Sequence, residues 1–131
     1  MPRKTFTAGE VLAAADVNLY LSNEVTLTMS TATTYTVATS DRYKILEFDA
    51  GSAVTVTIGT ATAFQAGERV DILQDGAGTV TITRDGTVVS LAGRGTAGTA
   101  YRIGQQYDAV SVVCVGTNSY RIIGNATAVL L

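Results

Sequence analysis

The chain has 131 residues, which is the size of one compact domain, and its formal net charge is −2. It contains no histidine and one cysteine, which excludes a Ser-His catalytic triad and an intrachain disulfide. Positive and negative residues are interspersed without a basic block, so the charge pattern points away from a nucleic-acid partner.

The chain carries no sequence signal for a membrane or for export. No run of about 18 apolar residues occurs, so the sequence predicts no transmembrane helix and no membrane partner. The opening MPRKTFTAGE lacks the apolar core of a secretory signal. We therefore expect the protein to be made and folded in a cytoplasm.

The segment at 4–21 is the part of the chain that predicts a helix. Thr7 and Glu10 have the spacing of a capping box, and Asp16 is placed to cap a second short turn. The residues that recur at helical spacing are Ala8, Val11, Leu12, Ala15 and Leu19. This narrow stripe, built partly of alanine, suits close packing on a flat surface. Because an isolated helix of this length is marginal in water, the segment needs a partner.

Residues 24–58 predict four strands, at 24–30, 33–39, 43–50 and 53–58, because apolar and polar positions alternate in each. In the first strand we expect Val25, Leu27 and Met29 to share a face, and in the second Tyr35 and Val37. In the third strand Leu46 and Phe48 share a face, and Ile45 lies on the other one. In the fourth strand we expect Val54, Val56 and Ile58 to face inward.

Residues 64–90 predict a β-meander. The sequence DGAG at 75–78 supplies one turn, and DG at 85–86 lies between two β-rich runs, which predicts a hairpin. A glycine-rich connection follows at 91–100, and GTN at 116–118 predicts the last hairpin loop.

The whole pattern predicts an all-β fold, a small β-sandwich or barrel-like domain with a short N-terminal helical arm. About nine or ten short strands follow one another with frequent turns, which is typical of sandwiches and barrels. The arm covers 1–23, and the β domain covers 24–131 with an apolar C-terminal tail. We expect this tail to dock, because three exposed apolar residues at its end would be unfavourable.

Patterns for catalysis or ligand binding are weak. GRGTAG at 93–98 has dinucleotide-binding spacing, but a strand follows it where that site needs a helix, which favours a plain loop. Glu47 and Asp49 share a strand face and could form a glycosidase-like pair or a cation site, although a solvated face is favoured. Cys114, in an apolar run, is predicted to be a buried small hydrophobe. We predict no enzyme, no cofactor and no metal site.

Six tyrosines are spread along the chain. Tyrosine is favoured at interfaces because it joins apolar area to a polar tip, and it is also ordinary in sheets, so both interpretations stay open. A surface near Tyr101–Tyr107 that stacks on sugars is one alternative role.

The segment KTFTAGEVLAAADVNLYLSNEV at 4–25 resembles the N-terminal signature of tailed-bacteriophage virion proteins, F-x-x-G-x-x-L-x-A-A-D-V-N. The residues that carry the match are Phe6, Gly9, Leu12, Ala14, Ala15, Asp16, Val17 and Asn18. GERVDILQDGAGTVTI at 67–82 and NSYRIIGN at 118–125 are similar to small β domains that end many phage fibre and appendage proteins.

The resemblance implies a structural or adhesive protein of the virion, with frequent trimers. Capsid decoration, a capsid or tail fibre and a minor tail protein are the positions it allows. Because the chain has no shaft, collagen-like repeat or extended coiled coil, its size favours a decoration protein that binds the assembled shell and stabilises it by bridging subunits. The implied partner is the major capsid protein, or else tail proteins. The alternatives are a tail or fibre-associated protein and a host-receptor or glycan-binding module.

We predict that residues 1–22 form an attachment arm that packs on the capsid or on a neighbouring subunit, with 24–125 as the outward β domain. An arm that folds back on its own domain is the alternative. The arm residues expected to contact the partner are Arg3, Lys4, Phe6, Val11, Leu12, Leu19 and Tyr20. Edge strands that need cover and the apolar tail predict a homotrimer, with oligomer contacts at Val129, Leu130 and Leu131.

Overall fold

The computed structural model describes residues 5, 7–11, 13–14, 27–86, 88–94 and 100–129. The described elements are β1 (Leu27–Ser30), β2 (Thr34–Thr36), the 3-10 turn η2 (Thr39–Asp41), β3 (Ile45–Phe48), β4 (Val54–Ile58), β5 (Arg69–Gln74), β6 (Val80–Arg84), β7 (Ser90–Ala92), β8 (Ala100–Ile103), β9 (Asp108–Gly116), β10 (Ser119–Gly124) and β11 (Ala126–Ala128). The all-β prediction is confirmed. The predicted helical arm is not shown: residues 7–11 and 13 form a turn and irregular backbone, with φ of +84° at Gly9, and most of the rest of the segment lies outside the described residues.

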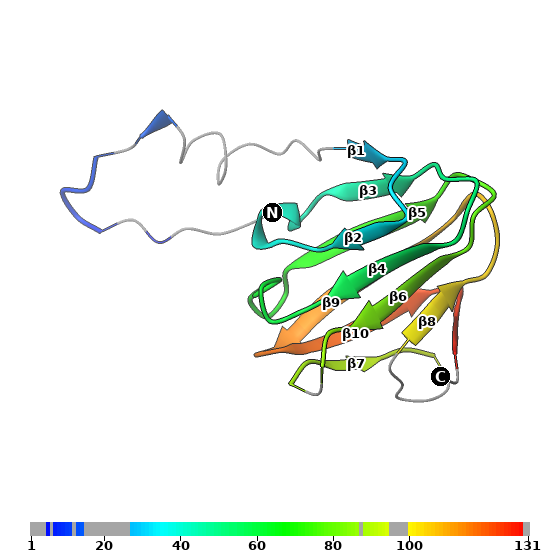
Figure 1. Cartoon of the computed structure of the whole chain (residues 1–131). Helices are drawn as coiled ribbons and strands as arrows, with labels where there is room; N and C mark the ends of the chain where they lie inside the picture. The colour runs from blue at the N-terminus through cyan, green and yellow to red at the C-terminus, as the bar shows by residue number, and fades with distance from the viewer. Residues whose placement is uncertain are drawn as a thin grey trace.

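The strands form two mixed sheets (Figure 1). Sheet A has the order β1-β3-β5-β9-β10-β7, and sheet B has the order β11-β8-β6-β4-β2. Alternate side chains of both sheets meet in one buried core, because successive residues of a strand point to opposite faces. The inward positions predicted for Val54, Val56 and Ile58 are confirmed, and Cys114 is buried as predicted.

The first six strands wind as a two-sheet β-solenoid. Strands β1, β3 and β5 are parallel neighbours in sheet A, and β2, β4 and β6 are parallel neighbours in sheet B. Parallel strands need a crossover connection, and here the crossover is the strand in the opposite sheet. Each strand therefore takes its backbone partner from the preceding or the following coil.

The predicted β-meander over 64–90 is wrong. Strands β5 and β6 lie in different sheets, and β6 pairs with β4 and β8 while β7 pairs with β10. The turn at 85–86 does have a left-handed glycine, with φ of +68° at Gly86, but it carries the chain to the other sheet. A turn dipeptide specifies a local backbone conformation, not the sheet that the next strand joins.

The hairpin at the end of the chain is confirmed. Strands β9 and β10 are antiparallel, and Asn118 in their connection has φ of +51°. Of the apolar C-terminal tail, only Val129 is described: it follows β11, which pairs with β8, and its N–H donates to the carbonyl oxygen of Ala100 at 2.9 Å.

The corners that join sheet A to sheet B stack on one another. The N–H groups of Asp75 and Gly76 both donate to the carbonyl oxygen of Phe48 at 3.0 Å, and that of Gly78 donates to Ala50 at 2.7 Å. A Cβ atom on Gly78 would overlap the carbonyl oxygen of Ser52. The glycine is therefore required by the close approach of two backbones.

The connection from β2 to β3 is held by a buried carboxylate. Asp41 accepts hydrogen bonds from the hydroxyl of Tyr35 and the N–H of Ala38, both at 2.9 Å, and its other oxygen lies 3.5 Å from Nζ of Lys44. Burial, together with the hydrogen bond to the Asp41 carboxylate and its charge, raises the pKa of Tyr35 to about 12. The buried charge is thus fully partnered, as its position requires.

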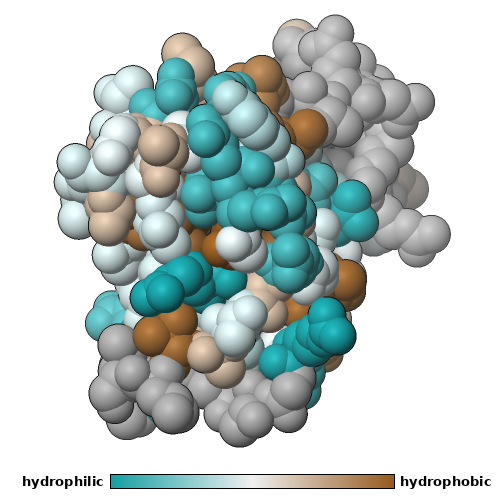
Figure 2. All heavy atoms as spheres, turned by 90° about the vertical axis from the view of Figure 1, so that its right-hand side faces the viewer, coloured by the Kyte–Doolittle hydropathy of each residue, from teal (hydrophilic) through white to brown (hydrophobic). Residues whose placement is uncertain are grey.

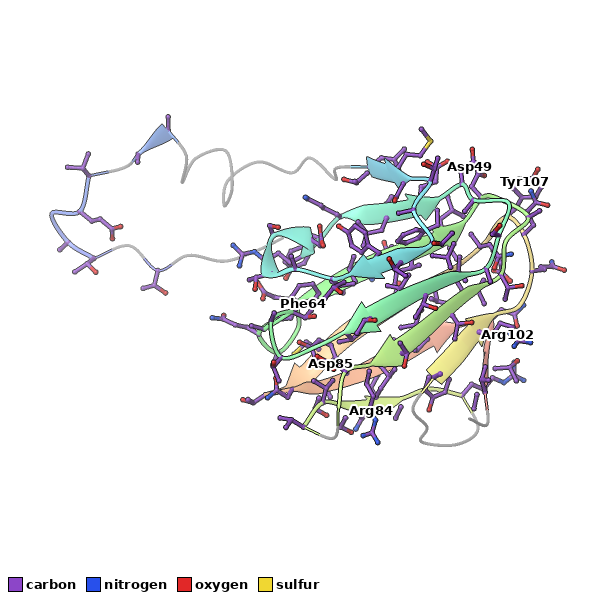
Figure 3. The ribbon with its side chains drawn as sticks, viewed as in Figure 1. Asp49, Phe64, Arg84, Asp85, Arg102 and Tyr107 are labelled. Carbon is purple, nitrogen blue, oxygen red and sulfur yellow. The ribbon has the colours of Figure 1, made fainter. Side chains whose placement is uncertain are left out.

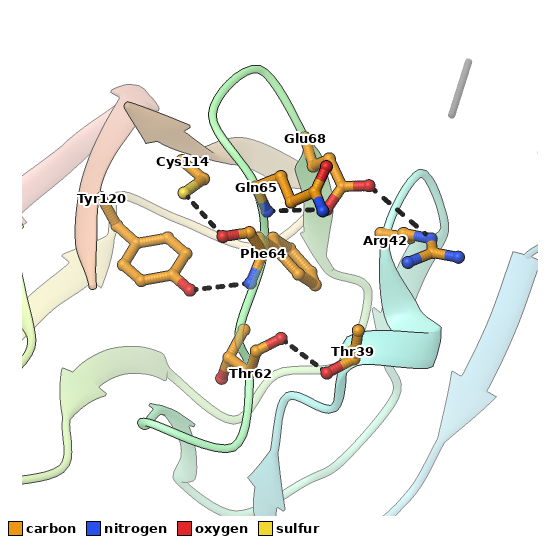
Figure 4. A network of polar contacts seen from close by, with 8 residues as sticks. All are labelled: Thr39, Arg42, Thr62, Phe64, Gln65, Glu68, Cys114 and Tyr120. Atoms are coloured by element: carbon orange, nitrogen blue, oxygen red, sulfur yellow. Dashed lines mark hydrogen bonds and ion pairs between the residues drawn. The ribbon is translucent and has the colours of Figure 1, made fainter. Parts of the chain in front are cut away.

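The corner between β4 and β5 lies beside the β2–β3 connection and carries a polar network (Figure 4). The N–H of Phe64 donates to the buried hydroxyl of Tyr120 at 3.2 Å, and its carbonyl oxygen accepts from Sγ of Cys114 at 3.2 Å. Glu68 accepts from the N–H of Gln65 at 2.7 Å and lies 3.7 Å from Nε of Arg42. These bonds fix an irregular segment against the β9–β10 hairpin.

Gly78→Ala is expected to destabilise the fold by about 3 kcal/mol or more, because the added methyl group meets backbone that cannot move aside without separating two coils. Gly51→Ala is the matched control, since a Cβ there meets no atom within 4 Å, and we expect a change within about 0.5 kcal/mol. Urea unfolding of both variants measures the difference. Equal stabilities would contradict the stacked-corner arrangement.

Tyr120→Phe is expected to lower the free energy of unfolding by about 1–3 kcal/mol, because the buried N–H of Phe64 loses its acceptor. Tyr107→Phe serves as the control, since the Tyr107 side chain is exposed. The two variants are compared by chemical denaturation, and an effect of Tyr120→Phe no larger than the control would show that this bond does not stabilise the corner.

Candidate interaction surface

Most side chains on the outer face of sheet A are apolar, although two arginines, two carboxylates and a serine lie among them. Its residues come from β1, β3, β5, β9 and β10, and pairing places them side by side. They are Leu27, Met29, Ile45, Glu47, Arg69, Asp71, Leu73, Ala109, Ser111, Val113, Val115, Arg121 and Ile123. Among them Leu27 is 57% exposed, Met29 63% and Ile123 60%. We call this surface the sheet A face.

A shallow groove of about 350 Å³ lies on the sheet A face. The residues that line it are Ile45, Asp71, Leu73, Ala109, Val110, Ser111 and Ile123. Its polar centre is already paired within the chain, since the hydroxyl of Ser111 donates to the Asp71 carboxylate at 2.6 Å and Arg69 lies 3.5 Å from the same carboxylate. The groove therefore offers mainly aliphatic contact to a partner.

The sheet A face is bordered by an acidic rim where β3 and β5 end. Glu47 and Asp49 come from the end of β3, and Asp75 directly follows β5. The pKa of Glu47 is raised above its ordinary value. The largest cause is a hydrogen bond with Asp75, followed by partial burial and by repulsion from the charges of Asp75 and Asp49. The predicted Glu47–Asp49 pair is thus part of a group of three carboxylates. Figure 2 looks at this side of the molecule and shows hydrophilic side chains gathered there.

The outer face of sheet B differs sharply from the sheet A face. Register aligns threonines in two rows across β2, β4 and β6. One row is Thr34, Thr55 and Thr81, continued by Arg102 and Thr127, and the other is Thr36, Thr57 and Thr83. This face needs no cover, because hydroxyl groups turned to solvent remain hydrated. The two outer faces therefore predict different roles, and the apolar one is the candidate interface.

Sequence reasoning missed the sheet A face, although a signal for it was present. The strands of sheet A contain adjacent apolar pairs, such as Ile45-Leu46, Ile72-Leu73 and Ile122-Ile123. Because neighbouring residues point to opposite faces, one member of each pair must face outward. In sheet B, by contrast, β4 and residues 80–83 of β6 alternate between apolar residues and threonine.

Few of the predicted partner-binding residues of the arm lie within the described residues. Val11 is described and is 84% exposed. Arg3, Lys4, Phe6, Leu12, Leu19 and Tyr20 lie outside the described residues. Half of the predicted capping box is present, since the N–H of Thr7 donates to the Glu10 carboxylate at 3.0 Å. Of the predicted oligomer contacts, Val129 is half-buried in its own domain, and Leu130 and Leu131 are not described.

The two tyrosines named for a sugar-stacking surface lie in opposite environments. Tyr101 is fully buried and cannot stack on a ligand. Tyr107 is 74% exposed, has φ of +68°, and its N–H is bound to the carbonyl oxygen of Gln74. Figure 3 shows it on the same side of the molecule as Asp49. Any such surface would therefore be built on Tyr107 and the acidic rim.

The other chemical patterns lead to no site in the described residues. GRGTAG at 93–98 follows β7 and precedes β8, and residues 95–98 of it are not described. The described part of the chain contains no group of three or more histidine, cysteine, aspartate or glutamate residues placed to hold a metal ion. No helix among the described residues has the length and apolar character needed to cross a membrane.

Comparison with family models and with curated proteins finds no match to this chain.

Glu47→Gln is expected to raise the melting temperature at neutral pH, because the raised pKa means that ionised Glu47 disfavours the folded state. This group contributes stability while protonated, and that contribution is lost as pH rises through the folded-state pKa. The gain in the variant should therefore shrink as pH falls toward about 4, the ordinary range of glutamate.

The same gain should shrink in about 1 M salt, where the Debye length is about 3 Å. Thermal unfolding across pH measures both effects. Asp49→Asn is the control, with a smaller rise expected because Asp49 is the weakest of the causes. A lower melting temperature for Glu47→Gln at neutral pH would contradict the repulsive rim.

Proposed function

We propose that this protein is a structural component of a tailed-phage virion, and that it decorates the capsid. The observation that carries the proposal is the combination of two features in one small chain. The first is an N-terminal segment with the virion-protein signature, whose described residues are exposed. The second is a two-sheet domain with exposed aliphatic side chains on the sheet A face. Together they fit a protein that assembles on a larger surface.

In the proposed role the arm anchors the protein on the shell or on a neighbouring subunit, and the β domain faces outward. The major capsid protein is the proposed partner, and the protein acts as a homotrimer without enzymatic activity, nucleic-acid partner or membrane contact. The edge strands β1 and β2 and the sheet A face give an oligomer surfaces to cover. Binding only to the assembled shell stabilises it by mass action, and many weak contacts add through multivalency.

A glycan- or receptor-binding module at the tail is the second candidate. The exposed ring of Tyr107 beside an acidic rim favours it, because aromatic faces and carboxylates are suited to sugar rings and hydroxyl groups. This role would also place the protein on the virion, but with the host surface as its partner.

The test is co-sedimentation of the purified protein with DNA-filled capsids that lack it, and in parallel with isolated tails. We expect saturable binding to capsids and none to tails. Binding to tails alone would assign the protein to the tail. Binding to host cells, without binding to capsids or tails, would support the receptor-binding module.

A truncated chain that begins at Asn23 tests the arm. We expect at least a tenfold loss of capsid affinity, which corresponds to about 1.4 kcal/mol. Its melting temperature should stay close to that of the full chain, because the described arm residues are exposed. Capsid binding as strong as that of the full chain would show that the arm is not the attachment element.

A further inference from the structure

We infer that the Asp85-Gly86 pair, in the connection from β6 to β7, is a site of spontaneous covalent modification, where aspartate converts to isoaspartate through a cyclic succinimide. This chemistry is independent of the proposed function. The sequence contains two aspartates that are followed by glycine, Asp75 and Asp85. Because the two pairs have the same reacting groups, their surroundings in the fold decide which pair reacts.

The reaction needs only the two residues and water. The backbone nitrogen of Gly86 attacks Cγ of the neutral Asp85 carboxyl group, a C–N bond forms, and the carboxyl hydroxyl leaves with the nitrogen proton as water. Water then adds to one of the two ring carbonyls and breaks its C–N bond. Opening at the main-chain carbonyl leaves the chain linked through Cγ, which is isoaspartate, and opening at Cγ restores aspartate. One water leaves and one returns, so no oxidant or reductant takes part.

The surroundings of the Asp85-Gly86 pair leave the reacting atoms accessible. Asp85 directly follows β6 (Figure 3), and both residues of the pair are exposed. Gly86 has φ of +68°, and a Cβ atom placed on it would meet nothing within 4 Å. Within the described part of the chain, neither the Asp85 carboxyl group nor the N–H of Gly86 forms a hydrogen bond. Glycine also presents no side chain that would shield its nitrogen from attack.

The Asp75-Gly76 pair, by contrast, is held in the stacked corners. Gly76 is buried, and its N–H donates to the carbonyl oxygen of Phe48 at 3.0 Å. A Cβ atom on Gly76 would overlap the backbone of Ala50, so this segment has no room to turn. The side chain of Asp75 is hydrogen-bonded to Glu47. The Gly76 nitrogen therefore becomes available only when the corner opens.

Local opening sets the difference in rate between the two pairs. A hydrogen bond of the folded interior breaks only in the small fraction of molecules in which its surroundings are open. Each tenfold fall in rate corresponds to about 1.4 kcal/mol of added barrier. We expect isoaspartate to form at Asp85 at least about tenfold faster than at Asp75 in the folded chain.

The modification changes the main chain at the point where it passes from sheet B to sheet A. Isoaspartate adds one carbon atom to the backbone of this connection. On one side of it, the N–H of Asp85 donates to the carbonyl oxygen of Ile58 at 2.9 Å, and Nη1 of Arg84 donates to the carbonyl oxygen of Val89 at 3.1 Å. On the other side lies β7, an edge strand that pairs with β10 alone. Strand β7 is therefore the element that must adapt to the longer connection.

Ageing of the folded full chain for several weeks, at neutral pH and body temperature, tests the inference. Trypsin cuts after Arg69, Arg84 and Arg94, so the two pairs fall in peptides 70–84 and 85–94, or in 70–94 where the cut at Arg84 is missed. Electron-transfer fragmentation in the mass spectrometer locates isoaspartate in each peptide. We expect it at Asp85, at least about tenfold above the amount at Asp75. Equal amounts at the two aspartates, or none at Asp85, would overturn the inference.

Two further samples separate the effect of the fold from that of the sequence. Asp85→Glu keeps the charge but requires closure of a larger ring, so peptide 85–94 of this variant should show no isomerised linkage. Ageing in urea that unfolds the wild-type chain exposes both pairs, so the ratio of isoaspartate at Asp85 to that at Asp75 should fall toward one. A ratio that stays at its native value would show that local sequence sets the rate, and would overturn the role assigned to the fold.

Discussion

The structure depends on the pairing of strands that are not consecutive in the chain. The chain changes sheets after every strand from β1 to β8, so no two consecutive strands in this part can satisfy each other's backbone groups. From β1 to β6 the parallel ladders join strands one coil apart, and the corners must stack closely enough to allow this, while β5 also pairs with β9 and β7 with β10. Gly78 lies where that requirement is tightest, against the backbone of Ser52.

This winding gives the molecule two outer faces. Both sheets begin at the first coil, so β1 and β2 are edge strands of sheets A and B respectively. Sheet B presents rows of threonine to solvent, whereas sheet A presents aliphatic side chains beside a rim of three carboxylates. Such an asymmetry is more useful to a protein that assembles than to one that stays alone, because an exposed apolar patch of several strands marks an interaction surface.

The sequence by itself determined the all-β class, the inward residues of strands such as β4, the last hairpin and the burial of Cys114, because alternation and turn residues act over a few neighbouring positions. It did not determine which strands pair. The Asp85–Gly86 turn predicted a hairpin between β6 and β7, and only the tertiary structure placed these strands in different sheets. The coils also differ in length, since Leu27 pairs with Ile45 while Ile45 pairs with Asp71, so no fixed repeat reveals the solenoid. The sheet A face was likewise decided by tertiary structure, because an adjacent apolar pair such as Ile72-Leu73 shows that one residue faces outward, but only long-range pairing gathers those residues on one surface.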